Sequence, residues 1–383
     1  MKILFWTLLS LIFYCYLGYP LLISLMSRFF AKQVHKSAIF PTVSIVIAAH
    51  NEEDVIKAKL DNLLILDYPK DRIEILIGSD ASTDQTDQIL QNYQDPRLRV
   101  TFHSQRRGKM MTVNDLVAIS QHEIIFFNDA RQHIEKDALR NLVQNFADPT
   151  VGCVSGELLF IKAEGATAEG VNLYWEYEKF IRTQEARVHS MLGATGAIYA
   201  IRKSLYVPAP AEVVLDDMFI PVKIIAQGYR AIFDGTAHAF DRAAHSPLEE
   251  YRRKARTLYG NYQIFALFPG AFNPCISPIA IQLFSHKFLR VMVPFLMIIL
   301  FPLNFLIMDT GVYKFIFVLQ IIFYAAAFIG VLSRRQGQGI FKPLAKLCYV
   351  PYVFCLLNFA ALAGFYRFIG VKQDIAWKKA REQ

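Results

Sequence analysis

Six short polar stretches of the sequence carry side chains that could do chemistry. The acidic stretches hold carboxylates, which bind divalent cations as hard oxygen ligands and can take a proton from a hydroxyl group. The basic stretches hold lysine and arginine, whose charge suits phosphate groups. In chain order they are HNEED from residue 50, SDASTD from residue 79, GK at 108–109, NDAR from residue 128, LDDMF from residue 215 and RRKART from residue 252.

Apolar, β-branched runs precede three of these stretches and are typical of buried strands. Helical patterns lie between the runs, and strands that alternate with helices indicate a parallel α/β sheet. The runs are continuously apolar, as strands covered on both faces must be. Ligands bind at the carboxyl ends of such strands, so HNEED, SDASTD and NDAR predict one shared polar crevice. The expected strands are 43–49, 73–79, 98–102 and 123–129, with helices near 52–66, 84–93 and 109–120.

Beyond residue 150 the pattern is less regular, but elements can still be expected. Two acids open the helix expected at 216–228, and Gly228 closes it. An apolar segment at 265–284 is broken by prolines and is expected to lie at a membrane interface. The other expected elements are a strand at 151–160, an amphipathic helix near 170–189, a glycine-containing loop and strand at 193–206, and a basic helix at 247–263.

Hydrophobic residues make up 54% of the chain and are unevenly distributed. Segments 3–26, 291–308, 312–332 and 344–365 are long and apolar enough to cross a bilayer, and the region between the first and second has soluble composition. A secretory signal peptide is the alternative for the N-terminal segment. That segment is long, however, and no small-residue cleavage site is evident before Lys32, which favours a retained anchor.

Basic residues flank the apolar segments, among them Arg28 and Lys36 after the first and Arg334 and Arg335 between the third and fourth. The positive-inside rule places these residues, and with them the middle domain, in the cytoplasm. Four crossings would put the C-terminus outside, whereas the basic residues at 367–381 favour the inside. The number and orientation of the last segments therefore stay open.

The remaining composition gives no reason to expect a nucleic-acid site or a cysteine metal site. Much of the formal net charge of +8 flanks the apolar segments, so it gives no reason to expect nucleic-acid binding. The 5 cysteines are scattered and lack the spacing of a metal site, which favours buried, reduced thiols.

The order and spacing of the polar stretches resemble the family-2 glycosyltransferases with a GT-A fold, although each motif alone is weak. In particular, the sequence is similar to the membrane-embedded processive synthases of cellulose, hyaluronan, chitin and poly-N-acetylglucosamine. The resemblance covers residues 40–285 closely and implies an α/β nucleotide-sugar-binding domain with a mainly parallel sheet. The implied organisation is a transmembrane anchor at 1–30, a cytoplasmic GT-A domain at 40–263, an interfacial segment at 264–289, transmembrane helices at 290–366 and a basic tail at 367–383.

The resemblance also implies a reaction and its partners. A multi-pass protein of the inner cell membrane would transfer a sugar, with inversion, from a UDP-sugar to a growing surface polysaccharide or oligosaccharide. Mg²⁺ or Mn²⁺ would be the cofactor. The acceptor would be a glycan or a lipid-linked acceptor, and subunits of an export complex could bind the protein. Two alternatives are single-sugar transfer to a polyprenyl-phosphate lipid and an inactive scaffold subunit of an export complex.

Donor-binding roles come from the strand-end stretches by resemblance. Asn51 and Glu52 would hold the nucleoside, although Asn51 could instead cap the following helix. Asp80 would accept a hydrogen bond from the base or ribose, with Ser79 where the family has a first acid, and Asp84 would mainly cap the next helix.

The diphosphate and cation roles fall on three further residues by resemblance. Lys109, after a flexible glycine, would reach the diphosphate. Asp129 matches the first acid of the family's Asp-x-Asp motif and would bind the divalent cation. Arg131 stands where the second acid is expected, and could neutralise phosphate directly or pair with Asp129.

Acceptor binding and catalysis fall on the later stretches by resemblance. Gly193 and Gly196 would lie beside the acceptor sugar with Asp216, and Asp217 would be the general base. The alternative for the acid pair is a favourable charge at a helix N-terminus.

The basic stretch resembles the Gln-x-x-Arg-Trp motif of processive enzymes. Arg253 stands at the Gln position as a donor-binding residue, and Arg256 at the Arg position would stabilise the leaving diphosphate. Thr257 replaces the Trp that would stack on the acceptor, which leaves processivity open. A basic helix resting on anionic lipid headgroups is the alternative.

Overall fold

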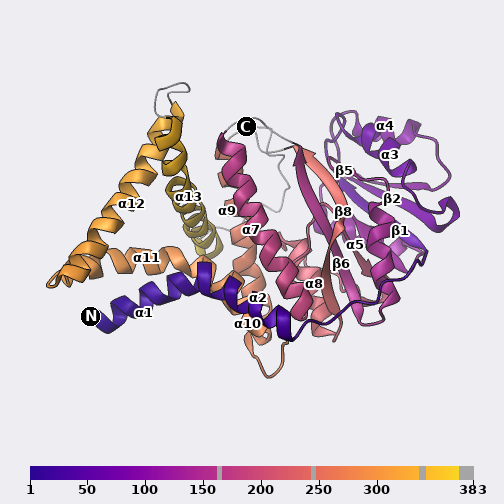
Figure 1. Cartoon of the computed structure of the whole chain (residues 1–383). Helices are drawn as coiled ribbons and strands as arrows, with labels where there is room; N and C mark the ends of the chain where they lie inside the picture. Colours follow the sequence, from indigo (N-terminus) through magenta and orange to yellow (C-terminus); the bar gives the residue numbers. More distant parts are fainter. Residues whose placement is uncertain (162–165, 243–246, 336–341, 371–383) are drawn as a thin grey trace.

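The computed structural model describes residues 1–161, 166–242, 247–335 and 342–370 (Figure 1). Its apolar helices α1, α11, α12 and α13 gather on one side and the sheet lies on the other, with α7 and α9 between them. Helix α7 spans Ala166–Val188 and α9 spans Pro247–Leu267. The two helices connect the parts directly, because α7 packs against α2 and α9 against α13.

An eight-stranded mixed sheet forms the centre of the larger part, in the order β3-β2-β1-β4-β7-β6-β8-β5. The first four strands in this order pair parallel, as the alternation of strand and helix predicts, and β6 pairs parallel with β8. Strands β7 and β5 run antiparallel to their neighbours. The bounds are β1 Val43–Ala49, β2 Ile73–Asp80, β3 Leu98–His103, β4 Ile124–Phe127, β5 His133–Ile134, β6 Val151–Ile161, β7 Tyr199–Arg202 and β8 Arg230–Arg242.

Strand β8 is the longest and was not expected from the sequence. Its apolar residues are interrupted by Asp234, Gly235 and Thr236, which are typical of a turn. In the structure the strand continues through this stretch, and the register against β6 shifts between Ser155 and Glu157. Such a bulge lets a paired strand absorb residues that favour a turn.

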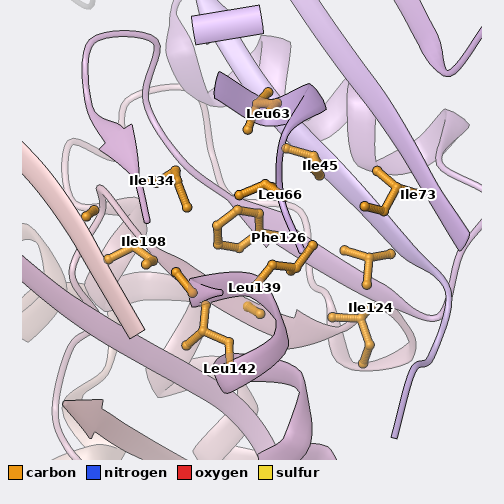
Figure 2. Packing of buried hydrophobic residues seen from close by; sticks show 14 of the residues in the cluster. Ile45, Leu63, Leu66, Ile73, Ile124, Phe126, Ile134, Leu139, Leu142 and Ile198 are labelled. Carbon is orange, nitrogen blue, oxygen red and sulfur yellow. The ribbon is translucent and has the colours of Figure 1, made fainter. Parts of the chain in front are cut away.

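Two apolar cores lie on opposite faces of the sheet, and helices complete both. Along β1 the side chains alternate between them: Ile45 and Ile47 belong to one core, and Val46 to the other. This explains the unbroken apolar run in the sequence. Phe126 lies at the centre of the first core, fully buried, with Leu139 of α6 nearby (Figure 2). Truncating such a side chain to alanine typically costs about 3–5 kcal/mol.

Helices α3, α4, α5 and α8 follow the expected pattern with shorter bounds, whereas α6 was not expected from the sequence. The helix expected from residue 52 begins at Ile56, because residues 53–55 form a turn. The bounds are α3 Ile56–Leu64, α4 Thr86–Asn92, α5 Lys109–Ile119, α6 Ala138–Val143 and α8 Asp216–Ala226.

Within the described residues, four helical runs are long and apolar enough to cross a membrane: Lys2–Phe29, Ala280–Leu306, Gly311–Leu332 and Cys348–Gly370. The first joins α1 Lys2–Phe13 to α2 Tyr19–Phe29, and the second joins α10 Ala280–Gln282 to α11 Leu289–Leu306. Helices α12 Gly311–Arg335 and α13 Lys342–Gly370 contain the other two. This chain is therefore a membrane protein by the length and composition of these helices.

The second run begins inside the segment expected to be interfacial. Residues 268–279 are a 3₁₀ turn and loop, and the helix then continues from Ala280 without a break. Pro278 precedes this helix rather than interrupting it. Of the expected basic tail, Arg367 lies in α13, and residues 371–383 lie outside the described residues.

Candidate active site

The loops after β1 and β2 are joined side chain to backbone. Asn51 has a positive φ of 54°, and its Oδ1 accepts a hydrogen bond from the Thr83 backbone N–H at 2.8 Å. Asn51 therefore ties the two loops together and does not cap α3, which begins later. Glu52 is buried, and its backbone N–H donates to Thr86 Oγ1 at 2.8 Å.

Asp80 is 1% exposed and holds the loop that leads into α5. Its two carboxylate oxygens accept the backbone N–H groups of Arg107 and Gly108, at 2.7 and 2.8 Å. Gly108 has a φ of 86°, a conformation that favours glycine. Asp80 thus fixes the start of α5, and its expected contact with a nucleoside stays a prediction.

Asp84 accepts a hydrogen bond from the N–H of Thr86, the first residue of α4, at 3.0 Å. It also accepts the Glu53 N–H at 3.2 Å. Satisfying an N–H of the first helical turn is the role expected of a capping residue. Ser79, in place of an acid, donates to Asp87 of the same helix at 2.5 Å.

Lys109 joins the acids of two distant segments. Its ammonium lies 3.1 Å from Asp129 Oδ1, after β4, and 3.2 Å from Asp216 Oδ2, at the start of α8. Burial lowers the pKa of Lys109, but Asp129 and Asp216 raise it above its usual value. Burial likewise raises the pKa of Asp129, and Lys109 with Arg131 holds it below the usual range. Three predicted site residues therefore meet here, with one cation between two carboxylates.

Asp217 lies against the loop that contains Gly193 and Gly196. The N–H of Ala194 donates to the Asp217 backbone oxygen at 2.6 Å. A Cβ added to Gly196 would lie 3.2 Å from Asp217 Oδ2, and one added to Gly193 would lie 3.4 Å from the Asp217 backbone oxygen. A side chain at position 196 would crowd the Asp217 carboxylate. Glycine at this position therefore lets the loop backbone lie close to that carboxylate.

The pKa of Asp217 is raised to about 6, because burial and the neighbouring Asp216 disfavour its charged form. Lys109 and Arg182 act in the opposite direction, and Asp129 raises it further. A carboxylate with a pKa near neutrality suits a general base.

Arg256 of α9 faces the same group of acids. Burial lowers its pKa, and the charges of Asp216, Asp129 and Asp217 partly oppose that effect. Arg253 lies on the same helix with its guanidinium over the Phe160 ring, 5.8 Å from the centroid.

Arg131 pairs with an acid that the sequence did not single out. Its Nε lies 3.1 Å from Asp241 Oδ2, which also accepts Gln132 Nε2 at 2.9 Å. Asp241 lies near the end of β8, and that strand was not expected, so neither was this partner. The charge of Arg131 still helps to lower the pKa of Asp129.

Among the described residues of the site, few oxygen atoms are placed to bind a divalent cation. In the part of the chain that the structure describes, no three or more His, Cys, Asp or Glu side chains form a metal-binding group. Asp129 offers a carboxylate, and the adjacent Asn128 is 4% exposed with a side-chain oxygen that has no hydrogen-bond partner among the described residues. These hard oxygens fit Mg²⁺ or Mn²⁺ if phosphate and water complete the coordination.

Comparison with known families finds a match that covers part of this region. The family model Glycosyl transferase family 2 matches residues 44–207, which include the β1, β2 and β4 strand ends and the loop at 193–196. The β-monoglucosyldiacylglycerol synthase of Synechocystis sp. is 34% identical over 155 residues, which is 37% of this chain and 32% of that protein.

Two further relatives extend the similarity. A probable glycosyltransferase of Bacillus subtilis is 27% identical over 249 residues, 61% of this chain and 58% of its own length. The poly-β-1,6-N-acetyl-D-glucosamine synthase of Staphylococcus aureus is 22% identical over 231 residues, 58% of this chain and 55% of its own. The chain thus aligns with between 32% and 58% of the length of these relatives.

A solved structure shares the fold over most of both chains. A mannosyltransferase from Pyrobaculum calidifontis, solved in complex with GDP-Man and Mn²⁺, superposes with a TM-score of 0.69 at 21% identity. The match covers 97% of this chain and 100% of that one, so the shared fold includes the flanking helices as well as the sheet.

Proposed function

Because the chain carries a glycosyltransferase family 2 domain, we propose that it transfers one sugar at a time, with inversion, from a UDP-sugar to a glycan or lipid-linked acceptor at the membrane. The observation that supports this most strongly is the meeting of Lys109, Asp129 and Asp216 beside Asp217. A phosphate-binding cation, a cation-binding acid and a base are the groups that such a transfer needs.

On the donor side, Lys109 would exchange its contacts with Asp129 and Asp216 for the diphosphate. Asp129 and Asn128 would hold Mg²⁺ or Mn²⁺, whose charge stabilises the diphosphate as it leaves. Arg131, held by Asp241, adds positive charge near Asp129. The nucleoside of the donor would be bound by Asn51, Glu52 and Asp80. Arg253 of α9 would contact the donor from the opposite helix.

On the acceptor side, Asp217 takes the proton of the acceptor hydroxyl. The freed oxygen forms a bond to the anomeric carbon as the bond from that carbon to the diphosphate oxygen breaks. The leaving diphosphate keeps the electron pair, and Arg256 stabilises its charge. Gly193 and Gly196 leave room for the acceptor beside Asp217, and Asp216 helps to orient it.

The apolar helices bear on where the acceptor would reach the site. We expect the catalytic domain to face the cytoplasm of the inner membrane, where nucleotide sugars are made, with multiple membrane passes. The sugar chain or lipid would then approach along the helices that contact α7 and α9. Export-complex subunits would be further partners for a polymer product.

A second candidate is transfer of a single sugar to a lipid acceptor such as a polyprenyl phosphate. Thr257 favours it, since its hydroxyl donates to the Arg253 backbone oxygen at 3.0 Å and the position offers no aromatic surface for a growing glycan. The Synechocystis relative, named for a glycolipid product, is consistent with this alternative.

The test is a transfer assay with purified protein in nanodiscs of native lipids. A panel of UDP- and GDP-sugars is supplied with Mg²⁺, with Mn²⁺ or with EDTA, and both nucleoside diphosphate release and product mass are measured. We expect one UDP-sugar to react in the presence of metal. A ladder of masses indicates a polymer and a single addition indicates a glycolipid. Absence of release with every donor would contradict the proposal.

A further inference from the structure

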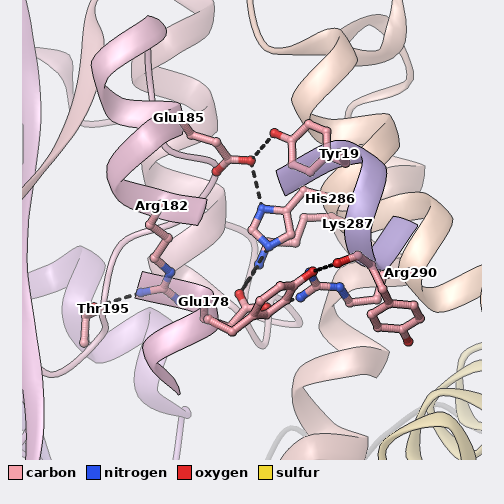
Figure 3. A network of polar contacts seen from close by, with 10 residues as sticks. Tyr19, Glu178, Arg182, Glu185, Thr195, His286, Lys287 and Arg290 are labelled. Atoms are coloured by element: carbon pink, nitrogen blue, oxygen red, sulfur yellow. Dashed lines mark hydrogen bonds and ion pairs between the residues drawn. The ribbon is translucent and has the colours of Figure 1, made fainter. Parts of the chain in front are cut away.

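Helix α7 lies between the membrane-spanning run that starts at Ala280 and the loop beside Asp217. Its membrane side carries a buried network of polar contacts, the α7 cluster (Figure 3). The α7 cluster consists of Glu178 and Glu185 of α7, Tyr19 of α2, and His286, Lys287 and Arg290 of the spanning run.

The α7 cluster fixes this helix against the membrane part. His286 Nδ1 lies 2.8 Å from Glu185 Oε1, and its Nε2 lies 3.2 Å from Glu178 Oε2. Tyr19 donates to Glu185 at 2.6 Å, and Arg290 pairs with Glu178. Since His286 and Glu185 are fully buried, each group depends on its partners for solvation, and α7 has little freedom to move.

Arg182 comes from the same stretch of helix. It follows Glu178 by four residues and precedes Glu185 by three, which places all three side chains on neighbouring positions of the helix surface. Its Nη1 donates to Thr195 Oγ1 at 3.0 Å, and Figure 3 shows the side chain extending away from the α7 cluster toward Thr195.

Thr195 lies within the loop from Gly193 to Gly196, between Ala194 and Gly196. Its own N–H donates to Ser155 Oγ of β6 at 2.8 Å. The next residue on either side contacts Asp217: the Ala194 N–H bonds its backbone oxygen, and Gly196 borders its carboxylate. The position of Thr195 therefore affects both neighbours of Asp217 in this loop, Ala194 and Gly196.

We propose that Arg182 is a positioning residue, which holds the loop Gly193–Gly196 against Asp217 from a helix that the membrane span keeps in place. The inference rests on the proposed function only in giving Asp217 the role of base. It adds a residue outside every motif of the sequence and assigns the membrane span a part in forming the acceptor side.

The charge of Arg182 acts on Asp217 as well. With Lys109 it lowers the pKa of Asp217, which burial and the other acids raise. Loss of the Arg182 charge should therefore raise that pKa further, and loss of the hydrogen bond alone should not. The titratable groups that face Asp217 are Asp216 of α8, Lys109 of α5, Arg182 of α7, Asp129 after β4, Tyr199 of β7 and Arg256 of α9.

Four variants separate the charge from the hydrogen bond. Arg182→Met removes both, Arg182→Lys keeps the charge, and Thr195→Val removes only the hydroxyl acceptor. Arg187→Met is the matched control, since Arg187 is an exposed arginine of the same helix. All are purified in nanodiscs, and thermal unfolding confirms that each is folded.

Two readouts are taken. The first is hydrogen–deuterium exchange of peptides that cover 190–200, which needs no activity. The second is kcat/KM for the acceptor as a function of pH. For Arg182→Met we expect faster exchange in this segment and a loss of about tenfold or more in kcat/KM. We also expect the acidic limb of the pH profile to shift to higher pH, because the pKa of Asp217 rises. Thr195→Val should speed exchange at 190–200 and leave the acidic limb of the pH profile in place. Arg182→Lys should keep the acidic limb at its wild-type pH. Arg187→Met should change neither the exchange nor the pH profile.

Unchanged exchange at 190–200 in both Arg182→Met and Thr195→Val would overturn the proposal, whatever the activity. An acidic limb that moves equally in Thr195→Val and Arg182→Met would also overturn the separate role of the charge. Absence of transfer by the wild type, together with a loosened loop in Arg182→Met, would instead refute the proposed function and leave the positioning role in place.

Discussion

Two groups of charges lie near the loop Gly193–Gly196, one buried and one partly exposed, and they are built differently. In the α7 cluster, Glu178 has cationic partners in Lys287 and Arg290, with His286 bonded to it as well. In the site, Asp217 stands next to another acid, and Lys109 is shared by Asp129 and Asp216.

The pKa values of the two acids reflect this difference. Burial raises the pKa of both carboxyl groups. For Glu178 the surrounding cations outweigh burial and hold the pKa well below its usual range. For Asp217 the charge of Asp216 adds to burial, and the pKa reaches about 6. A cluster whose cations outweigh burial maintains structure, whereas Asp217, whose neighbouring cations do not, has a pKa suited to taking a proton.

Asp217→Asn should have the largest effect, because it removes the base and leaves the shape unchanged. We expect kcat to fall by about 10²–10⁴-fold, the usual contribution of general base catalysis, with donor affinity retained. Transfer rates and donor binding are measured side by side. Asp54→Asn, at an exposed acid, is the control. Full activity in Asp217→Asn would assign the base elsewhere.

Glu178→Gln should affect stability instead. Removing one partner from a buried ionic cluster typically costs about 3–5 kcal/mol, because the remaining charges lose their compensation. We expect a lower free energy of unfolding in detergent titrations, with the acidic limb of the pH profile unchanged in the folded fraction. Glu176→Gln, whose side chain is 68% exposed, is the matched control. Equal stability of the two variants would show that the α7 cluster is not structural.

Arg256→Met should lower kcat by about 10²–10³-fold, comparable to the loss of one group that stabilises developing charge. The acceptor KM should change little, since the guanidinium acts on the leaving diphosphate. Steady-state kinetics with varied donor and acceptor check this, and Arg252→Met on the exposed side of the same helix is the control. A change confined to membrane association would instead favour the lipid-contact role.

The pH dependence should be the smallest effect and follows from the raised pKa of Asp217. A base acts only when deprotonated, so kcat/KM should be constant above pH 7 and fall about tenfold per unit below a pH near 6. The profile is measured with saturating metal at constant ionic strength. A limb near pH 4, the usual range for an aspartate, would show that Asp217 is less buried or is not the base.

Local chemistry could be predicted from the sequence because it depends on neighbours in the chain. The apolar run 43–49 is strand β1 to the residue, and Asp84 lies at the start of α4. The roles of Asp80 and Asn51 were harder to predict, because their carboxylate and amide oxygens accept backbone N–H groups of other loops. Which N–H groups come within reach depends on the tertiary fold.

Long-range charge pairs could not be predicted at all. Glu178 and His286 are separated by 108 residues, and neither belongs to a motif. In the sequence alone, His286 and Lys287 next to an apolar segment are most simply interpreted as lipid headgroup contacts, which the buried position of His286 contradicts. Asp241 was missed because its strand contains residues typical of a turn.

The most direct test of the central claim is the anomeric configuration of the product. A single displacement, with Asp217 activating the acceptor oxygen, must invert the anomeric carbon. The product made by the purified protein from an α-linked donor is analysed by the anomeric ¹H–¹³C coupling in NMR. A β-linked sugar is the predicted result. An α-linked sugar would contradict the account, because retention requires a second displacement or another mechanism.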